Sequence, residues 1–243
     1  MSGFNWQDIL ALINDILQSA IVIFGTSIVL YNLSHSVRER VTRAFTALLA
    51  FVVIVLMTEL LITQTISEQY VESWLRVGWI GIAQVPAAMF HLADALLVTT
   101  GDYSKRRRIL VRVAYFVGIG FLMLVGFTDL IVGDLVSIPR APHLQAGLLF
   151  PLFTAYFWVM TGISIFSLSR ARQRSLTKIT RRRMFIILLA LIAAPLSVYP
   201  YLLLSSSTSL AFPILFWLAL ITGNVFVGIM FAMLTLQLVY FGA

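Results

Sequence analysis

Ionisable side chains lie inside several long apolar stretches of this chain. Asp15, Glu59, Arg76 and Asp129 each stand among residues that are otherwise typical of a membrane-spanning helix. Counted from the outer ends of the helices predicted below, the first three lie about 7 to 12 Å deep at 1.5 Å per residue, and Asp129 lies nearer the surface. Charges at such depths are unfavourable unless they are paired, so we expect Arg76 to pair with Glu59, Asp15 or both.

This layer of charges predicts a ligand-binding pocket that opens to the outside of the membrane. One cation cannot neutralise three acids, so a proton, water, a bound cation or a cationic group on a ligand would supply the missing charge. The expected pocket residues are Asp15, Glu59, Arg76, Trp79, Gln84 and Asp129, completed by Asn14, Gln18, Gln64 and Tyr199. The alternative is an ion-pair network that only holds the first four helices together, and the sequence leaves both interpretations open.

A second polar group lies toward the other end of the third apolar stretch. His91 and Asp94 are three residues apart and would share one helix face. A histidine beside a carboxylate can pass a proton or respond to pH, because its unperturbed pKa is about 6.5. Together with Asn224, this pair is our candidate for signalling or proton relay. The alternative is ordinary bonding to nearby polar groups, with Asn32, His35 or the following basic loop as partners.

The composition places these residues in an integral membrane protein. The chain is 60% hydrophobic and only 11% charged, which is typical of the membrane class. We expect one all-α domain over residues 1–243, a bundle of seven transmembrane helices. Their predicted ranges are 9–33, 41–67, 71–99, 109–131, 146–168, 184–204 and 212–240. The link between the fourth and fifth helices contains two prolines and is expected to be non-helical.

The third helix is the predicted centre of this bundle. At about 100° per residue, Arg76 and Asp94 fall on the same face about five turns apart, and His91 lies to one side. A polar stripe of this kind should face other helices rather than lipid. Pro86 lies midway along the stretch, where it leaves a backbone carbonyl unpaired and favours a kink.

The basic residues predict the orientation of the bundle. All but two of the 17 Lys and Arg residues lie near the first, third and fifth loops, so the positive-inside rule puts the N-terminus outside and the C-terminus in the cytoplasm. The net charge of +7 then reflects topology, and no nucleic-acid partner is expected. The fifth loop is expected to face anionic lipid headgroups through Arg170, Arg172, Arg174, Lys178, Arg181, Arg182 and Arg183.

The sixth and seventh helices contain the residues that would permit motion. Pro195, Pro200 and Pro213 interrupt regular helix hydrogen bonding, and Gly223 and Gly228 allow close approach. If a signal crosses the membrane, we expect these two helices to move relative to the third. Ordinary helix packing is the alternative.

Several kinds of chemistry are not expected. The chain has no cysteine, which removes disulfides, thiol catalysis and thiolate metal sites. Both lysines, Lys105 and Lys178, lie in predicted loops, so no lysine inside a helix is available to form a Schiff base with retinal. His91 is the only histidine well inside a predicted span, too few for a bis-haem site, and no HExxH or serine-hydrolase pattern is present. We therefore expect no enzyme activity, no cofactor and no metal site.

The stretch from Trp74 to Leu97, WLRVGWIGIAQVPAAMFHLADALL, followed by the basic loop GDYSKRRR, resembles the seven-helix N-terminal sensor region of bacterial histidine kinases. Relatives of that region also precede diguanylate cyclases, GAF-containing regulators and phosphatases. The resemblance implies reception of a signal in the membrane and its transfer to a cytoplasmic output domain. This chain departs from the pattern by ending at Ala243 without an output motif, so we expect a sensor module of a longer protein or one that acts through a separate partner.

Taken together, these observations predict a sensory receptor module in the bacterial inner (plasma) membrane. Its expected partners are membrane lipids, a small ligand of unknown identity and a cytoplasmic signalling domain or protein, with a homodimer as one arrangement. A small ion-coupled transporter is the main alternative, because charges at two depths and proline-broken helices also suit a carrier. A non-catalytic subunit of a membrane complex is the third.

Overall fold

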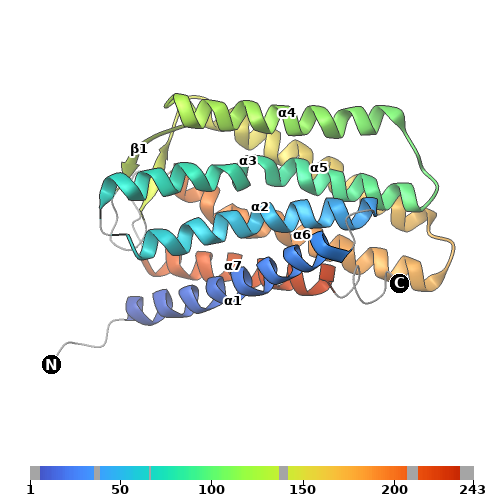
Figure 1. The fold of residues 1–243 in the computed structure, drawn as a ribbon, viewed down its shortest axis with the longest axis horizontal. Coiled ribbons are helices and arrows are strands. Elements are labelled where there is room, and N and C mark those ends of the chain that lie inside the picture. Colours follow the sequence, from blue (N-terminus) through green and yellow to red (C-terminus); the bar gives the residue numbers. More distant parts are fainter. Residues whose placement is uncertain (1–5, 36–38, 66, 137–141, 207–212, 236–243) are drawn as a thin grey trace.

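Seven helices run along the long axis of the molecule within the residues that the computed structural model describes, which are 6–35, 39–65, 67–136, 142–206 and 213–235 (Figure 1). Their bounds are α1 (Trp6–His35), α2 (Arg40–Thr63), α3 (Glu68–Thr99), α4 (Lys105–Phe127), α5 (Phe150–Arg174), α6 (Lys178–Ser206) and α7 (Pro213–Thr235). The predicted all-α class and the number of helices are confirmed for this part of the chain.

A β-hairpin connects α4 to α5. Strands β1 (Val132–Val136) and β2 (His143–Ala146) pair antiparallel, with Val132 opposite Ala146 and Leu135 opposite Leu144. The link was predicted to be non-helical, which is confirmed, but the two strands were not predicted. The hairpin forms because its apolar side chains are buried: Ile131, Val132 and Leu144 are fully covered by the helices beside them. The fourth helix accordingly ends at Phe127 rather than at residue 131.

The polar ends of α4, α5 and α6 are helical, where the sequence had suggested loops. The fourth helix begins at Lys105 rather than at residue 109, because the Ser104 side chain caps it by accepting a hydrogen bond from the Arg107 backbone N–H. The fifth helix continues to Arg174 and the sixth begins at Lys178. Arginine is a good helix former, so these helices extend past their apolar segments. Only residues 175–177 connect them.

Helix α3 lies at the centre of the bundle, as predicted. It packs against α2, α4 and α5 and touches β2, and Figure 1 shows it between α4 and α2. In its most apolar stretch 89% of the residues are buried, compared with 22% in α1, 50% in α2, 28% in α4 and 33% in α5. The helix is continuous through Pro86.

Five of the described helices, α1 to α5, are long and apolar enough to cross a membrane. Their outward faces carry large apolar side chains such as Phe24, Phe116 and Phe127, which in water would be unfavourable but in lipid are not. The chain is therefore a multi-pass membrane protein. The predicted hinge residues Pro195, Pro200 and Pro213 and the pocket residue Tyr199 lie outside the residues whose side chains the structure describes.

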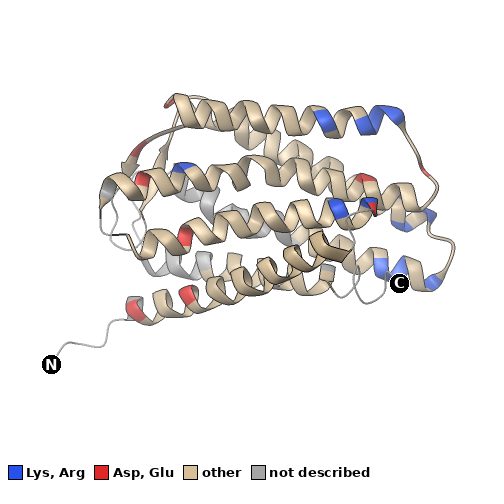
Figure 2. Ribbon diagram, in the orientation of Figure 1, with Lys and Arg blue, Asp and Glu red and all other residues tan. Residues whose placement is uncertain are grey.

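Charged residues are distributed unevenly along the bundle, with most Lys and Arg residues at one end (Figure 2). We call the end that holds the N-terminal turns of α2, α4 and α6 the basic end, because most of the described Lys and Arg residues lie there. The opposite end, beside β1 and β2, is called the hairpin end. The predicted clustering of basic residues is confirmed, except that Arg38 and Arg140 lie outside the described residues. The assignment of the basic end to the cytoplasm stays a prediction.

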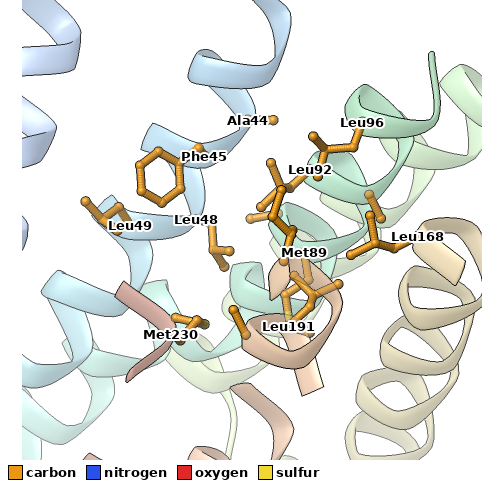
Figure 3. Close-up of a cluster of buried hydrophobic side chains, with 14 of the residues drawn as sticks. Ala44, Phe45, Leu48, Leu49, Met89, Leu92, Leu96, Leu168, Leu191 and Met230 are labelled. Carbon is orange, nitrogen blue, oxygen red and sulfur yellow. The ribbon is translucent and has the colours of Figure 1, made fainter. Parts of the chain in front are cut away.

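Two large apolar clusters fill most of the interior, and a smaller third one lies between α3 and α4. The cluster nearer the basic end draws its buried side chains from every helix except α4, and Tyr115 of α4 packs against it. Its members include Phe45, Leu48, Met89, Leu168 and Leu191 (Figure 3). The cluster nearer the hairpin end is aromatic and includes Trp79, Phe121, Phe150, Phe153 and Phe157. Helix α3 contributes to both large clusters, so its position is determined along its whole length.

Helices α2 and α3 approach each other closely at two glycines. A Cβ atom built on Gly78 would lie 2.8 Å from Thr58 Oγ1, and one on Gly81 would lie 2.5 Å from Val55 Cγ2 and still closer to the Phe51 carbonyl oxygen. The backbone of Phe51 and the β-branched side chains of Val55 and Thr58 have little freedom to move away from an added methyl group. Glycine is therefore required at this contact.

We predict that Gly81→Ala lowers the free energy of unfolding by about 1–3 kcal/mol, because the added methyl group forces α2 and α3 apart. Thermal unfolding in detergent micelles, followed by circular dichroism, measures the change. Gly120→Ala in α4 is the matched control, since a Cβ atom there meets nothing within 4 Å, and we expect it to be neutral or slightly stabilising. An unchanged melting temperature in Gly81→Ala would contradict the close α2–α3 contact.

Candidate functional site

At the hairpin end, Arg76 pairs with residues of its own helix and of the loop after α4. Its Nε donates to Glu72 Oε1 at 3.0 Å, its Nη2 to Asp129 Oδ1 at 2.8 Å, and its Nη1 to the Val125 carbonyl oxygen at 2.6 Å. The predicted pairing of Arg76 with Glu59 or Asp15 is therefore wrong. The helix face that carries Arg76 is turned toward α4, away from α1.

The remaining acids of the predicted layer bond to amides. Gln18 Nε2 donates to Glu59 Oε2 at 2.5 Å, which joins α1 to α2. Asp15 is half-buried, with the Asn14 side chain as its hydrogen-bond partner. Asn14 Oδ1 also accepts a hydrogen bond of 2.7 Å from Asn224 Nδ2, a buried contact between α1 and α7. These residues form an amide–carboxyl group across three helices.

The hydrogen bond to Asn14 shows where the Asn224 side chain lies. The sequence interpretation grouped it with His91 and Asp94 as part of a relay, whereas the structure places its amide beside Asn14. In α1 and α7, Ile21 lies near Gly228 and Gly25 lies near Phe231, so the two helices run parallel. Asn224 thus belongs to the amide–carboxyl group. Its amide therefore bonds away from His91 and Asp94, and a signalling role for it stays a prediction.

Trp79 and Gln84 point into the protein rather than toward an outer pocket. Trp79 is fully buried and lies edge-on to Phe153 and Phe150, with ring centroids 4.9 and 6.4 Å apart. Gln84 is buried against Gly118 of α4, where a Cβ atom would lie 2.8 Å from its Oε1. That Oε1 atom has no hydrogen-bond partner among the described residues. The residues bonded to Arg76 and the amide–carboxyl group around Glu59 are separate, since they share no residue.

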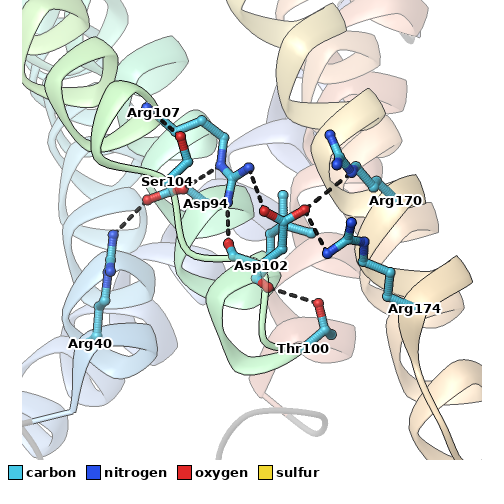
Figure 4. Close-up of polar contacts among 9 residues, drawn as sticks. Arg40, Asp94, Thr100, Asp102, Ser104, Arg107, Arg170 and Arg174 are labelled. Carbon is cyan, nitrogen blue, oxygen red and sulfur yellow. Dashed lines mark hydrogen bonds and ion pairs between the residues drawn. The ribbon is translucent and has the colours of Figure 1, made fainter.

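The basic end contains the most buried charge among the described residues, Asp94 of α3. Its side chain is 1% exposed and both oxygens are occupied: Arg40 Nη2 of α2 donates to Oδ2 at 2.6 Å, and Arg107 Nε of α4 donates to Oδ1 at 3.0 Å (Figure 4). An interior carboxylate with two guanidinium partners is well compensated. Asp94 therefore ties together the helices on either side of α3.

Asp102, between α3 and α4, extends this contact to α5. Its Oδ1 accepts a hydrogen bond from Arg107 Nη1 at 3.0 Å, and Arg107 also donates to its backbone carbonyl. Its Oδ2 forms ion pairs with Arg170 Nε at 3.2 Å and Arg174 Nη1 at 3.0 Å (Figure 4). We call the two aspartates and four arginines the Asp–Arg network. Asp102 was not predicted as a site residue. The feature of the sequence that could have indicated it is an acidic residue just before a run of basic residues.

Hydrogen bonding to Arg107 is the main reason that the pKa of the Asp102 carboxyl is lowered from its ordinary value. Burial opposes the shift, while the positive charges of Arg107, Arg170 and Arg174 add to it. The carboxylate is therefore the form that the fold stabilises. Since Asp102 lies outside the helices, acid in the surrounding solution can reach it.

His91 does not contact Asp94 through a hydrogen bond in the described structure. Its Nδ1 lies 3.3 Å from Tyr115 Oη of α4, and the two rings meet edge to face. The predicted His91–Asp94 relay pair is not formed. The alternative partner for Asp94, the basic loop, is confirmed by Arg107. Arg76 and Asp94 were predicted to share a helix face, and both contact α4 or the segment after it. His91, predicted to lie to one side of that face, also contacts α4 through Tyr115.

The seven basic residues that were expected to face lipid headgroups have varied surroundings. Arg170 and Arg174 are held by Asp102, Arg172 lies over the Phe185 ring at 4.5 Å, and Arg181 Nη2 donates to the Ser175 carbonyl oxygen at 3.3 Å. Lys178 and Arg182 are exposed, and Arg183 is half-buried. At least two of the seven thus hold the bundle together.

Comparisons with known proteins add no family to this geometry: neither a scan against protein-family models nor a search of curated proteins found a match. Within the described residues, no group of three or more His, Cys, Asp or Glu side chains is placed to hold a metal ion. The resemblance to histidine-kinase sensor regions stays a prediction.

We predict that Asp94→Asn lowers the free energy of unfolding by about 2 kcal/mol or more, because Arg40 and Arg107 lose a buried counter-charge. Chemical unfolding in mixed micelles measures the loss. Asp134→Asn is the matched control, since Asp134 is an exposed carboxylate in β1, and its stability should stay within about 0.5 kcal/mol of the original. Equal stability of the two variants would contradict the role assigned to Asp94.

Acid should weaken the network through Asp102. Because its pKa is lower in the folded protein than the value of about 3.9 expected in the unfolded chain, its carboxylate stabilises the fold above about pH 4. That stabilisation is lost as the pH falls through the folded-state pKa. Thermal unfolding between about pH 7 and pH 3 should show a smaller acid-induced decrease in melting temperature for Asp102→Asn than for the unchanged protein. Identical decreases would exclude this contribution.

Proposed function

We propose that this chain is a membrane-embedded sensory receptor module. In this proposal the hairpin end faces the outside and receives a ligand, and the basic end passes the signal to a cytoplasmic output domain or partner protein. The observation that carries the proposal is the pair of polar contacts that join α3 to the α4 region at both ends: Arg76 with Asp129, and Asp94 with Arg107. A disturbance of one contact can reach the other through a single buried helix.

The mechanical argument rests on the burial of α3. A helix whose interior residues are packed on all sides cannot bend or rotate locally without disturbing its neighbours. Helices in such bundles instead shift as units by about 1–2 Å. Since Arg76 and Asp94 are separated by about 27 Å at 1.5 Å per residue, a shift of α3 against α4 at the hairpin end changes the Asp94–Arg107 geometry at the basic end.

The hairpin end offers an ion pair that a ligand can reach. Asp129 is 72% exposed and Glu72 is 40% exposed, while Arg76 between them is 23% exposed. A cationic ligand competes with Arg76 for these carboxylates, and an anionic ligand competes with them for Arg76. Either competition loosens α3 from the segment after α4. The orientation rests on the positive-inside rule, which assigns the end rich in Lys and Arg to the cytoplasm.

The absence of cysteine from the sequence permits a direct test of coupling. Spin labels at Tyr103→Cys and Leu176→Cys report the separation of the α3–α4 loop and the α5–α6 turn at the basic end, where both residues are exposed. We predict that adding Arg76→Gln, which releases the contact at the far end, shifts this distance by about 2 Å or broadens its distribution. Double electron–electron resonance in nanodiscs measures it.

Asp134→Asn, a charge removal at an exposed site of β1 near the hairpin end, is the control and should leave the distance unchanged. If Arg76→Gln also leaves it unchanged, the ends are not coupled and the sensor proposal fails. Uptake of a labelled solute into proteoliposomes that is lost in Asp94→Asn would instead favour an ion-coupled carrier.

A further inference from the structure

A cavity opens at the basic end on the face of α3 that lies between α2 and α4. Its volume is about 470 Å³, and its lining residues are Arg40, Arg43, His91, Arg108, Val111, Arg112 and Tyr115. Cavities that bind small molecules have volumes of about 300–1,000 Å³. The space is therefore sufficient for a headgroup-sized ligand. None of the residues that we expected to form the outer pocket lines it.

The cavity has four guanidinium groups and few counter-charges. Arg40 is paired with Asp94, and Arg108 lies 5.0 Å above the Tyr103 ring. Arg43 and Arg112 form no ion pair with the described part of the chain and are exposed. Like charges around one cavity repel one another, and an anion bound between them would remove this repulsion.

The backbone adds to the positive potential. Arg40 and Arg43 lie in the first turn of α2, and Arg108 and Arg112 lie in the first two turns of α4. The N-terminal turns of helices carry partial positive charge, which favours bound anions. Residues from the first two turns of both helices line the same cavity. The Tyr115 hydroxyl and the His91 ring, which also line the cavity, supply further polar atoms.

We infer that this cavity binds a phosphate-bearing anion. Guanidinium groups match the geometry of phosphate oxygens in a two-pronged contact, and the hydroxyl of Tyr115 can donate a further hydrogen bond. Exposed apolar side chains of α4, including Ile109, Val113 and Phe116, lie beside the basic lining residues. This arrangement suits the headgroup of an anionic phospholipid, with its acyl chains along α4. A soluble phosphate compound has the same chemistry and is tested alongside.

The test uses the full chain in neutral detergent with three probes: phosphatidylglycerol, phosphatidylcholine and inorganic phosphate. Native mass spectrometry measures retained lipid, and isothermal titration calorimetry measures phosphate. We expect phosphatidylglycerol to be retained in preference to phosphatidylcholine. The double variant Arg43→Gln/Arg112→Gln should weaken binding of the preferred probe on the order of tenfold or more. The double variant Lys105→Gln/Arg106→Gln removes the same charge from the first turn of α4 outside the cavity and should change binding less than twofold.

Both substituted arginines are exposed, and matching melting temperatures of the variants will show that each is folded. Arg43→Lys/Arg112→Lys keeps the charge and should restore part of the binding. Retention of phosphatidylglycerol without inorganic phosphate binding assigns the site to lipid headgroups, and binding of inorganic phosphate as well assigns it to soluble phosphate compounds. Equal losses in the two glutamine variants would reduce the effect to general surface charge and overturn the inference, as would no preference for any phosphate-bearing anion over phosphatidylcholine.

Discussion

The structure depends on the pairing of charges along one buried helix. A charged side chain within a membrane bundle must find a partner or lie near water, and α3 holds Arg76 near one end and Asp94 near the other. Asp94, at 1% exposure, obtains two guanidinium partners from the helices on either side. This requirement brings the N-terminal turns of α2 and α4 together over α3. The Asp102 contacts then add α5, so the basic end is joined by charge while the interior is joined by apolar packing.

The same pairing creates a surplus of positive charge. Asp94 and Asp102 are shared among four arginines. Further arginines on α2 and α4 line the adjacent cavity and form no ion pair with the described part of the chain. A network with equal numbers of positive and negative charges would hold the helices together but would not attract an anion. The surplus at the basic end links the structural role of the Asp–Arg network to the inferred anion site. The two occupy neighbouring parts of one surface and share Arg40.

The sequence was sufficient for the helices, the central position of α3 and the shared face of Arg76 and Asp94, because apolar length and helical periodicity are local properties. It was insufficient for pairing partners. Arg76 was expected to reach Glu59 of α2, but its side chain is turned toward α4, where it bonds to the Val125 carbonyl oxygen and to Asp129. The hairpin was missed because its stability comes from burial against distant helices, which no short stretch reveals. Asp102 was overlooked although Arg107 is close in sequence, because its contacts with Arg170 and Arg174 join segments more than sixty residues apart.

The central claim is that the contacts at the two ends of α3 are energetically coupled. A double-mutant cycle with Asp129→Asn at the hairpin end and Arg107→Gln at the basic end, measured as free energies of unfolding in micelles, tests it most directly. Residues so far apart normally give additive effects within about 0.5 kcal/mol. Transmission through α3 predicts a departure from additivity clearly larger than that. Additive losses would contradict the account, because each ion pair would then stabilise its own end alone.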